Sequence, residues 1–333
     1  DLGGTWDLFK YPGIRSDSDL FTFGYEFKPW KEKKAIADGR SIKAYVEETA
    51  AENGIKEHIR FLTRVVDIDW QSDKHYWRVT LKSEESGQHE HIAARWIFNA
   101  SGYYRYDKGY APHFKGQSQF NGQIVHPQHW PEDLEYENKR VVVIGSGATA
   151  VTLVPALAKS ASHVTMLQRT PSYVLPVPVD DPIAKHLRAW FSEDTAFKAA
   201  RWFNIAKQRW VYAFCQRFPH RVRKIIRSLN AKMLPEGYPV DIHFNPPYNP
   251  WEQRLCAVPG GDLFESISKG KASVATDTID TFTETGIKLD SGQHIEADII
   301  VTATGLNLLP LGGIVPKIDG EAISLPECVT YKG

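Results

Sequence analysis

The clearest pattern of hydrophobic and polar positions lies in residues 140–178. The run RVVVI at 140–144 has the continuous hydrophobic character of a strand that is buried on both faces. A glycine-rich turn, GSGATA, follows at 145–150, and a hydrophobic helical stretch then leads to a second strand run, HVTMLQR, at 163–169. Strand, helix and strand in this order predict two parallel strands with a crossover helix, and therefore an α/β fold.

Weaker patterns predict elements on both sides of this unit. They indicate helices over 41–53, 180–232 and 262–270, and strands or hairpins over 59–70, 76–82, 91–104, 286–295 and 297–305. Ser41 is expected to cap the first of these helices, and a Pro-rich loop is expected over 233–253.

The composition of the chain argues against several classes of protein. Forty basic residues balance forty acidic ones, which argues against a nucleic-acid binder held by a general positive field. The three cysteines form no CxxC pair, so neither a structural zinc nor disulfide-reductase chemistry is supported, and a cytoplasmic location is expected. The chain begins without Met and stops within a predicted fold, so we expect a piece of a longer protein.

The turn after the first strand carries a G-x-G-x-x-A pattern at Gly145, Gly147 and Ala150. The glycines permit a tight turn and close approach of the backbone to a pyrophosphate, whose charge suits the N–H groups that open a helix. The expected binding residues are Gly145, Ser146, Gly147, Ala148 and Thr149. The alternative is a tight turn without a ligand.

The end of the second strand indicates which dinucleotide binds. NAD and FAD sites usually place an acid there for the ribose hydroxyls, but residues 138–179 contain no Asp or Glu. Arg169, followed by Thr170, stands there instead, and its planar guanidinium suits a 2′-phosphate. We therefore expect NADPH, with a solvated strand-end charge as the alternative for Arg169.

Upstream of the turn, residues 120–131 read FNGQIVHPQHWP and contain Phe120, Gly122, His126, Trp130 and Pro131 at F-x-G-x-x-x-H-x-x-x-W-P spacing. This stretch resembles the fingerprint of type I Baeyer–Villiger monooxygenases, within the class B flavin monooxygenases. Related N- and S-oxygenating enzymes usually lack the Trp-Pro ending. A metal site is poorly supported, since His126 and His129 have only Glu132 and Asp133 as acidic neighbours.

The resemblance covers nearly the whole chain. The segment GGTWDLFKYPGIRSDSD is similar to the one that lines the flavin, which implies cofactor contacts for Gly3, Gly4, Thr5, Trp6 and Asp17. The stretch TATG implies a domain crossing at Thr304 and Gly305, and PWEQRLC places Arg254 where the family carries its active-site arginine. The stretches around 141–158 and 163–174 are most similar to the ethionamide-activating subgroup.

The implied fold is a flavoprotein with two dinucleotide-binding domains. The FAD domain comprises 1–115, without its first βαβ unit, and 305–333; the NADPH domain comprises 116–178 and 254–304, with a helical insertion at 179–253. Because the first glycine-rich turn of the family lies upstream of Gly3, we expect this chain to hold FAD less well than NADPH.

The implied activity is an FAD- and NADPH-dependent monooxygenase. It would insert one oxygen of O2 into a ketone, or transfer it to a sulfide or thioamide sulfur, through a flavin C4a-(hydro)peroxide. Arg254, Asp17 and His126 are the implied catalytic residues. An N- or S-oxygenating flavin monooxygenase, and an NADPH-binding module without turnover, are the alternatives.

One further stretch is unusual. Residues 198–232 contain ten basic residues and no acid, with Trp and Phe at helical spacing. A basic amphipathic helix of this kind can lie on a membrane surface, and the alternative is an insert that packs on the NADPH domain.

Overall fold

The structure is a computed structural model that describes residues 2–324 and 327–328. Of the expected return segment 305–333, residues 325–326 and 329–333 lie outside the described part. The chain divides into two compact units. Unit 1 contains Ala50–Tyr110 and the residues from Leu306 onward, and unit 2 contains Leu2–Thr49 and Ala111–Gly305. Residues 2–49 thus pack with unit 2, whereas the domain boundaries expected from the sequence stay a prediction.

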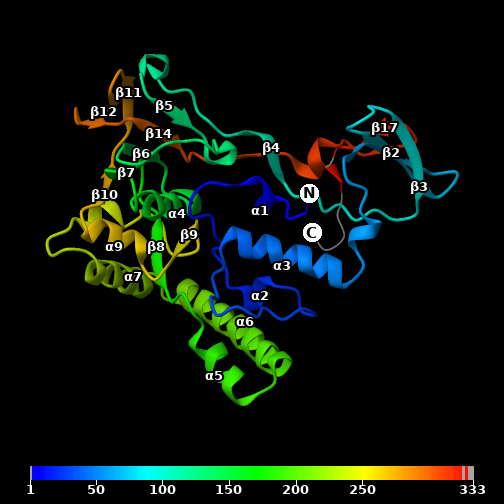
Figure 1. The fold of residues 1–333 in the computed structure, drawn as a ribbon, viewed down its shortest axis with the longest axis horizontal. Coiled ribbons are helices and arrows are strands. Elements are labelled where there is room, and N and C mark those ends of the chain that lie inside the picture. The colour runs from blue at the N-terminus through cyan, green and yellow to red at the C-terminus, as the bar shows by residue number, and fades with distance from the viewer. Residues whose placement is uncertain (1, 325–326, 329–333) are drawn as a thin grey trace. The chain divides into compact units, whose positions relative to one another are not determined.

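Unit 2 is built on a five-stranded sheet in the order β10-β7-β6-β14-β5, in which every neighbouring pair is parallel (Figure 1). Its strands are β5 (Gln123–Val125), β6 (Arg140–Ile144), β7 (His163–Gln168), β10 (Ala272–Thr276) and β14 (Ile299–Thr302). The hydrophobic runs of the sequence form the buried centre of this sheet, as the βαβ pattern predicts.

The crossover helix α4 (Ala148–Leu157) joins β6 to β7. It is hydrophobic on all sides because it is covered on all sides, and most of its residues are buried. The helix α9 (Asp262–Ser268) lies beside it and precedes β10. These parallel strands with their helices confirm the α/β class.

The other elements of unit 2 are short strands and helices. The strands are β8 (Tyr173–Val177) paired with β9 (Leu255–Pro259), and the antiparallel group β11 (Ile279–Thr283), β12 (Gly286–Leu289) and β13 (His294–Glu296). The helices are α1 (Thr5–Leu8), α2 (Leu20–Phe23), α3 (Gly39–Glu52, which runs on into unit 1), η2 (Gln117–Gln119), η3 (Pro127–His129), α5 (Pro182–Trp190), α6 (Glu193–Arg217), α7 (Pro219–Met233) and α8 (Val240–His243).

The sequence expectations for two helical regions are refined here. The helical region 180–232 is three helices, because Phe191–Ser192 and Phe218 have non-helical backbones. The helix α3 begins at Gly39, so Ser41 lies inside its first turn, and Asp38 accepts the Ser41 N–H at 3.0 Å. No helix of the described residues is long and apolar enough to cross a membrane.

Unit 1 contains a second sheet in the order β17-β16-β1-β2-β3. Its strands are β1 (Thr63–Gln71), β2 (Tyr76–Ser83), β3 (His89–Ala94), β16 (Lys317–Ile318) and β17 (Glu321–Ala322). The unit also contains η1 (Lys56–His58), η4 (Pro310–Gly313), and β4 (Tyr104–Gly109) paired with β15 (Leu306–Leu308). The single strand expected over 91–104 is therefore wrong, since β3 ends at Ala94 and β4 starts only at Tyr104.

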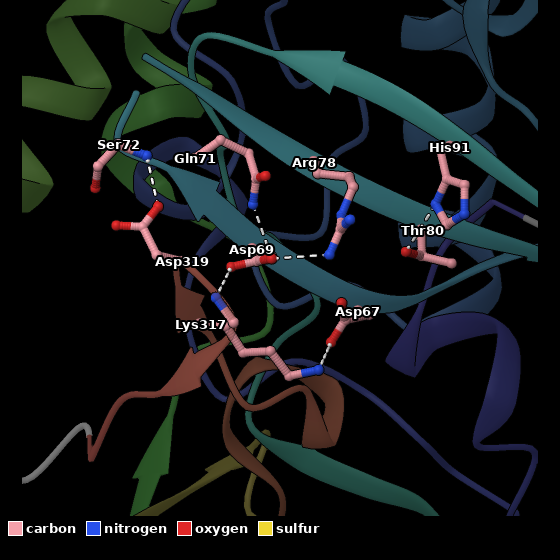
Figure 2. Close-up of polar contacts among 10 residues, drawn as sticks. Asp67, Asp69, Gln71, Ser72, Arg78, Thr80, His91, Lys317 and Asp319 are labelled. Carbon is pink, nitrogen blue, oxygen red and sulfur yellow. Dashed lines mark hydrogen bonds and ion pairs between the residues drawn. The ribbon is translucent and has the colours of Figure 1, made fainter. Parts of the chain in front are cut away.

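A buried carboxylate joins the distant chain segments of this sheet (Figure 2). Asp69 is 1% exposed, and its two oxygens accept hydrogen bonds from Arg78 Nη2 at 2.9 Å, Gln71 Nε2 at 2.8 Å and the Gly320 N–H at 2.9 Å. Asp69 therefore fixes the turn between β16 and β17 against β1 and β2.

Replacing Asp69 by Ala leaves the Gly320 N–H without its buried acceptor. We expect the free energy of unfolding of unit 1 to fall by about 1–3 kcal/mol, with loss of hydrogen-exchange protection at Gly320. Asp67→Ala is the matched control, because Asp67 forms an ion pair with the half-exposed Lys317 (2.7 Å) at the same edge, and its loss costs less than about 1 kcal/mol. Equal losses in the two variants would contradict this account.

Candidate functional site

Several residues singled out in the sequence meet at one edge of the parallel sheet in unit 2. His126 follows β5, Gly145 follows β6, Arg169 follows β7, and Thr304 lies two residues beyond the end of β14. The chain passes from β6 to β7 on one side of β6, whereas β14 and β5 lie on its other side, so the strand order reverses at β6. Ligands of open α/β sheets bind at such a reversal, beyond the carboxyl ends of the strands.

The glycine turn is shaped by the neighbouring strand end. Gly145 has φ +136°, and a Cβ there would lie 2.4 Å from the carbonyl oxygen of Ala303. Gly147 caps α4 without any side-chain hydrogen bond, and Ala150 is fully buried against the strand. The first N–H groups of α4, including those of Ala148 and Thr149, therefore open toward an approaching anion.

Arg254 lies at this turn. Its Nη1 is 2.9 Å from the position that a Cβ of residue 147 would take, and its Nε donates to Ser172 Oγ at 3.3 Å. Ser172 Oγ is in turn 2.9 Å from Ser146 Oγ. The hydroxyls of Ser146 and Ser172 thus hold the guanidinium beside the turn, where it adds positive charge to the helix N-terminus.

Asp17 lies close to the same place but makes no ion pair with Arg254 among the contacts of the described residues. Burial raises the pKa of the Cys256 thiol to about 11, while the charge of Arg254 lowers this pKa and that of Asp17 raises it. Both charges therefore lie within electrostatic reach of Cys256. The expected role of Asp17 in steadying Arg254 stays a prediction.

The segment that contains Asp17 packs on α4. A Cβ on Gly13 would lie 2.7 Å from Ala156 Cβ, so the backbone there approaches the helix closely. Burial raises the pKa of the Tyr11 hydroxyl, and a hydrogen bond with Thr149 lowers it. Arg15 forms an ion pair with Asp262 of α9 at 2.5 Å. The segment similar to a flavin lining is thus attached to the dinucleotide turn.

The first glycines of the chain lie near the fingerprint stretch. Gly3 (φ +109°) and Gly4 (φ +52°) turn the chain into α1, which begins with Thr5 and Trp6. A pocket of about 390 Å³ then lies between the end of α1 and the residues after His126; its lining is Asp7, Leu8, Lys10, Gln128, His129, Trp130 and Glu132. The structure therefore brings the start of the chain and the fingerprint together.

His126 joins that stretch to the end of the last strand. Its Nδ1 accepts the Gln128 N–H at 3.2 Å, so the proton of the neutral ring lies on Nε2, which is 3.2 Å from the Gly305 carbonyl oxygen. The bond ties residue 126 to residue 305. Among the described residues, no group of three His, Cys, Asp or Glu side chains could hold a metal ion.

Arg169 and Thr170 are exposed at the end of β7. The preceding Gln168 is buried, and its Nε2 donates to the His243 carbonyl at 2.8 Å and to Thr276 Oγ1 at 2.9 Å. These bonds fix the strand end, so the guanidinium of Arg169 extends from a rigid base into solvent.

Comparison with known proteins identifies the family of the chain. Residues 35–311 match the family described as FMO-like, flavin-binding monooxygenase-like. The chain belongs to this family. It is 54% identical over 333 residues to the FAD-containing monooxygenase EthA of Mycobacterium tuberculosis, and 51% identical over 337 residues to the putative FAD-containing monooxygenase MymA of the same species. All of this chain, and 68% of each relative, is covered.

A solved structure of a steroid monooxygenase bound to NADP has the same fold, with a TM-score of 0.76 at 22% identity. The match covers 95% of this chain and 67% of that one. The expected family and the fold class with two dinucleotide-binding domains are thereby confirmed, and the chain is a flavin monooxygenase.

Sequence reasoning missed three residues of this region: Tyr11, Ser172 and Gln168. The stretch QRTPS contains Gln168 and Ser172 close to Arg169, so their position at the end of the strand could have indicated them. Tyr11 gave none, since its partner Thr149 is far away in the sequence.

The two glycines of the turn are expected to respond differently to replacement by Ala. Gly145→Ala forces a Cβ against the Ala303 carbonyl at positive φ, and should lower the free energy of unfolding by about 2–3 kcal/mol. Gly147→Ala meets only the flexible end of Arg254, so the melting temperature should hold while NADPH binding, measured by calorimetry, weakens. Equal destabilisation by both changes would contradict this division.

Proposed function

We propose that this flavin monooxygenase uses FAD and NADPH to insert one oxygen atom of O2 into a small ketone, or to add it to the sulfur of a sulfide or thioamide. The observation that carries the proposal is the meeting of His126, the Gly145 turn and Gly305 at one sheet edge, with Arg169 in place of an acid. EthA and MymA are described as FAD-containing, and the steroid monooxygenase structure holds NADP.

The residues present fit the pyrophosphate and 2′-phosphate of NADPH. The turn at Gly145 and Gly147 has no side chain that could block a phosphate, and the opening N–H groups of α4 carry no side-chain cap. Arg254 supplies positive charge beside the glycine turn, for the pyrophosphate, and Arg169 supplies it at the end of β7, for the 2′-phosphate. Thr170, next to Arg169, offers a further hydroxyl.

The glycines near the N-terminus provide part of a flavin surface. Gly3 and Gly4 are at positive φ, and Thr5 and Trp6 lead to Asp7 and Leu8, which line the pocket beside the fingerprint. These residues and Asp17 would contact the flavin. When bound, the two cofactors supply the hydride and the activated oxygen, and the chain supplies position and charge.

The residues of the chain act mainly by position and electrostatics. Arg254 offers a fixed positive charge for anionic oxygen or phosphate, and the Ser172 hydroxyl keeps its Nε in place. We expect Asp17 to steady that charge. His126 holds the fingerprint stretch to the exit of β14, and Thr304 and Gly305 form that exit.

A ketone substrate is favoured over exclusive N- or S-oxygenation because the fingerprint ends in Trp130–Pro131. We also propose that the enzyme attaches to a membrane surface through residues 198–232, whose ten basic residues and absence of acid support it.

The activity test uses the flavin-loaded protein with a small ketone and a methyl sulfide. We expect NADPH oxidation with ester formation from the ketone, followed by gas chromatography. Arg254→Ala should lower ester formation roughly 100- to 1,000-fold, as loss of a preorganised charge does. Sulfoxide without ester would instead favour the N- or S-oxygenating alternative, and no turnover would favour a module that only binds NADPH.

Cofactor preference is tested by Arg169→Ala. Loss of a charge-assisted bond to the 2′-phosphate should raise the KM for NADPH roughly 10- to 150-fold and leave that for NADH unchanged. Arg95→Ala, an exposed arginine of unit 1, is the control and should leave both values unaltered. An equal rise for both cofactors would show that Arg169 does not read the phosphate.

A further inference from the structure

The helix α6 has a face that nothing in the described chain covers. The helix packs against α5, α2 and α7; its N-terminal half buries Ala196, Ala200 and Asn204 on one side, and Cys215 is buried near its C-terminal end. Lys198 and Trp202 each lie two positions from Ala200, and thus about 200° around the helix from it. Every residue from 206 to 213 is exposed. In Figure 1, α5 and α6 form the part of unit 2 farthest from its parallel sheet.

Most of the basic residues of α6 and of the following helix α7 are exposed. Three of the ten basic residues at 198–232 are engaged: Arg201 donates to the carbonyls of Phe21, Thr22 and Gly24, Arg223 to Asn245, and Arg227 to Asp241. The other seven are exposed and form no ion pair among the contacts of the described residues; they are Lys198, Lys207, Arg209, Arg217, Arg221, Lys224 and Lys232. Lys198 lines a pocket that also contains Glu26 and Asp194, and the charges of the other six are available to an anionic partner.

Large aromatic side chains lie among these charges. Trp202 and Trp210 are 69% and 65% exposed, whereas Trp is usually well buried. Trp210 stacks on Phe214 with ring centroids 5.3 Å apart, so its ring is held in a defined position. Exposed Trp beside Lys and Arg is typical of surfaces that lie at the boundary of a lipid bilayer, where one end of the ring is apolar and the other wet.

We propose that α6 docks on a bilayer of anionic phospholipid through the face formed by Lys198, Trp202, Arg209, Trp210 and Arg217. The proposal specifies the surface attachment proposed above and rests on it. The basic residues bind the headgroups, and the two indoles enter the interface. A second copy of this chain is a poorer occupant, because a two-fold contact would set the same positive charges against each other.

The test is co-sedimentation of the flavin-loaded full chain with vesicles. We expect binding to phosphatidylcholine vesicles that contain about 30% phosphatidylglycerol, little binding to phosphatidylcholine alone, and release when NaCl rises from about 0.1 M to about 1 M. Lys198→Gln with Arg209→Gln should lower the partition coefficient roughly 30-fold. The matched control, Lys56→Gln with Lys74→Gln, removes two exposed charges of unit 1 and should bind as the wild type does.

A second pair of variants tests the indoles. Trp202→Ala with Trp210→Ala should weaken binding to anionic vesicles and remove the blue shift of tryptophan fluorescence on binding, whereas Trp96→Ala, at a residue 73% exposed in unit 1, should not. Melting temperatures check that each variant is folded. Equal binding to neutral and anionic vesicles, or unchanged binding by both α6 variants, would overturn the proposal.

Two further outcomes separate this proposal from others. Concentration-dependent dimers that Trp202→Ala with Trp210→Ala abolishes, without vesicle binding, would assign the face to a second copy and overturn lipid docking. Turnover of NADPH and ketone is measured on the same preparations. Vesicle binding without turnover would overturn the proposed oxygenation but not the docking of α6. Turnover without vesicle binding would overturn the docking but not the oxygenation.

Discussion

The close approach of Gly145 to the Ala303 carbonyl is the constraint on which the site depends. The strands β6 and β14 are parallel neighbours in register, with Ile144 opposite Thr302, so both chains leave the sheet at the same level. A side chain at 145 would lie 2.4 Å from that carbonyl oxygen and force the exits apart. With glycine there, the chain turns directly into α4, and the Gly305 carbonyl remains within reach of His126. The shape of the glycine turn and the contact of His126 with Gly305 are therefore consequences of one backbone contact.

The sequence predicted the parts of the fold in which local pattern and tertiary environment agree. The strand run at 140–144 is continuous and buried, and the structure places it at the centre of the sheet. The strand β8 was missed because it pairs only with β9 and contains Pro176, which argues against a strand. Asp38 rather than Ser41 caps α3, since its carboxylate accepts the Ser41 N–H and two polar residues compete there for one helix start. Which residue caps the helix depends on the path of the preceding loop.

The sequence indicated which residues belong to the candidate site, but not which side chains contact one another there. Local spacing and strand ends pointed to Gly145 and Arg169, and the resemblance to a family fingerprint pointed to His126; in the structure each directly follows a strand of the same sheet. Nothing local pairs Arg254 with Ser172, 82 positions away, or Tyr11 with Thr149. The resemblance suggested that Asp17 steadies Arg254. The structure brings both charges near Cys256, and the pairing itself depends on side-chain positions that sequence spacing does not determine.

The composition of the turn determines which groups can orient a phosphate and which can neutralise its charge. The residues Gly145 to Thr149 carry no charge, and the first turn of α4 has no acid. Backbone N–H groups there can orient a phosphate but neutralise only a fraction of its charge. In the NADPH site proposed above, the missing positive charge comes from two arginines of other segments, Arg254 beside Gly147 and Arg169 at the end of β7. Because small uncharged residues form the turn, the backbone can come close to an anion, and because the arginines come from elsewhere, their charges can lie at two separate points along one extended dinucleotide.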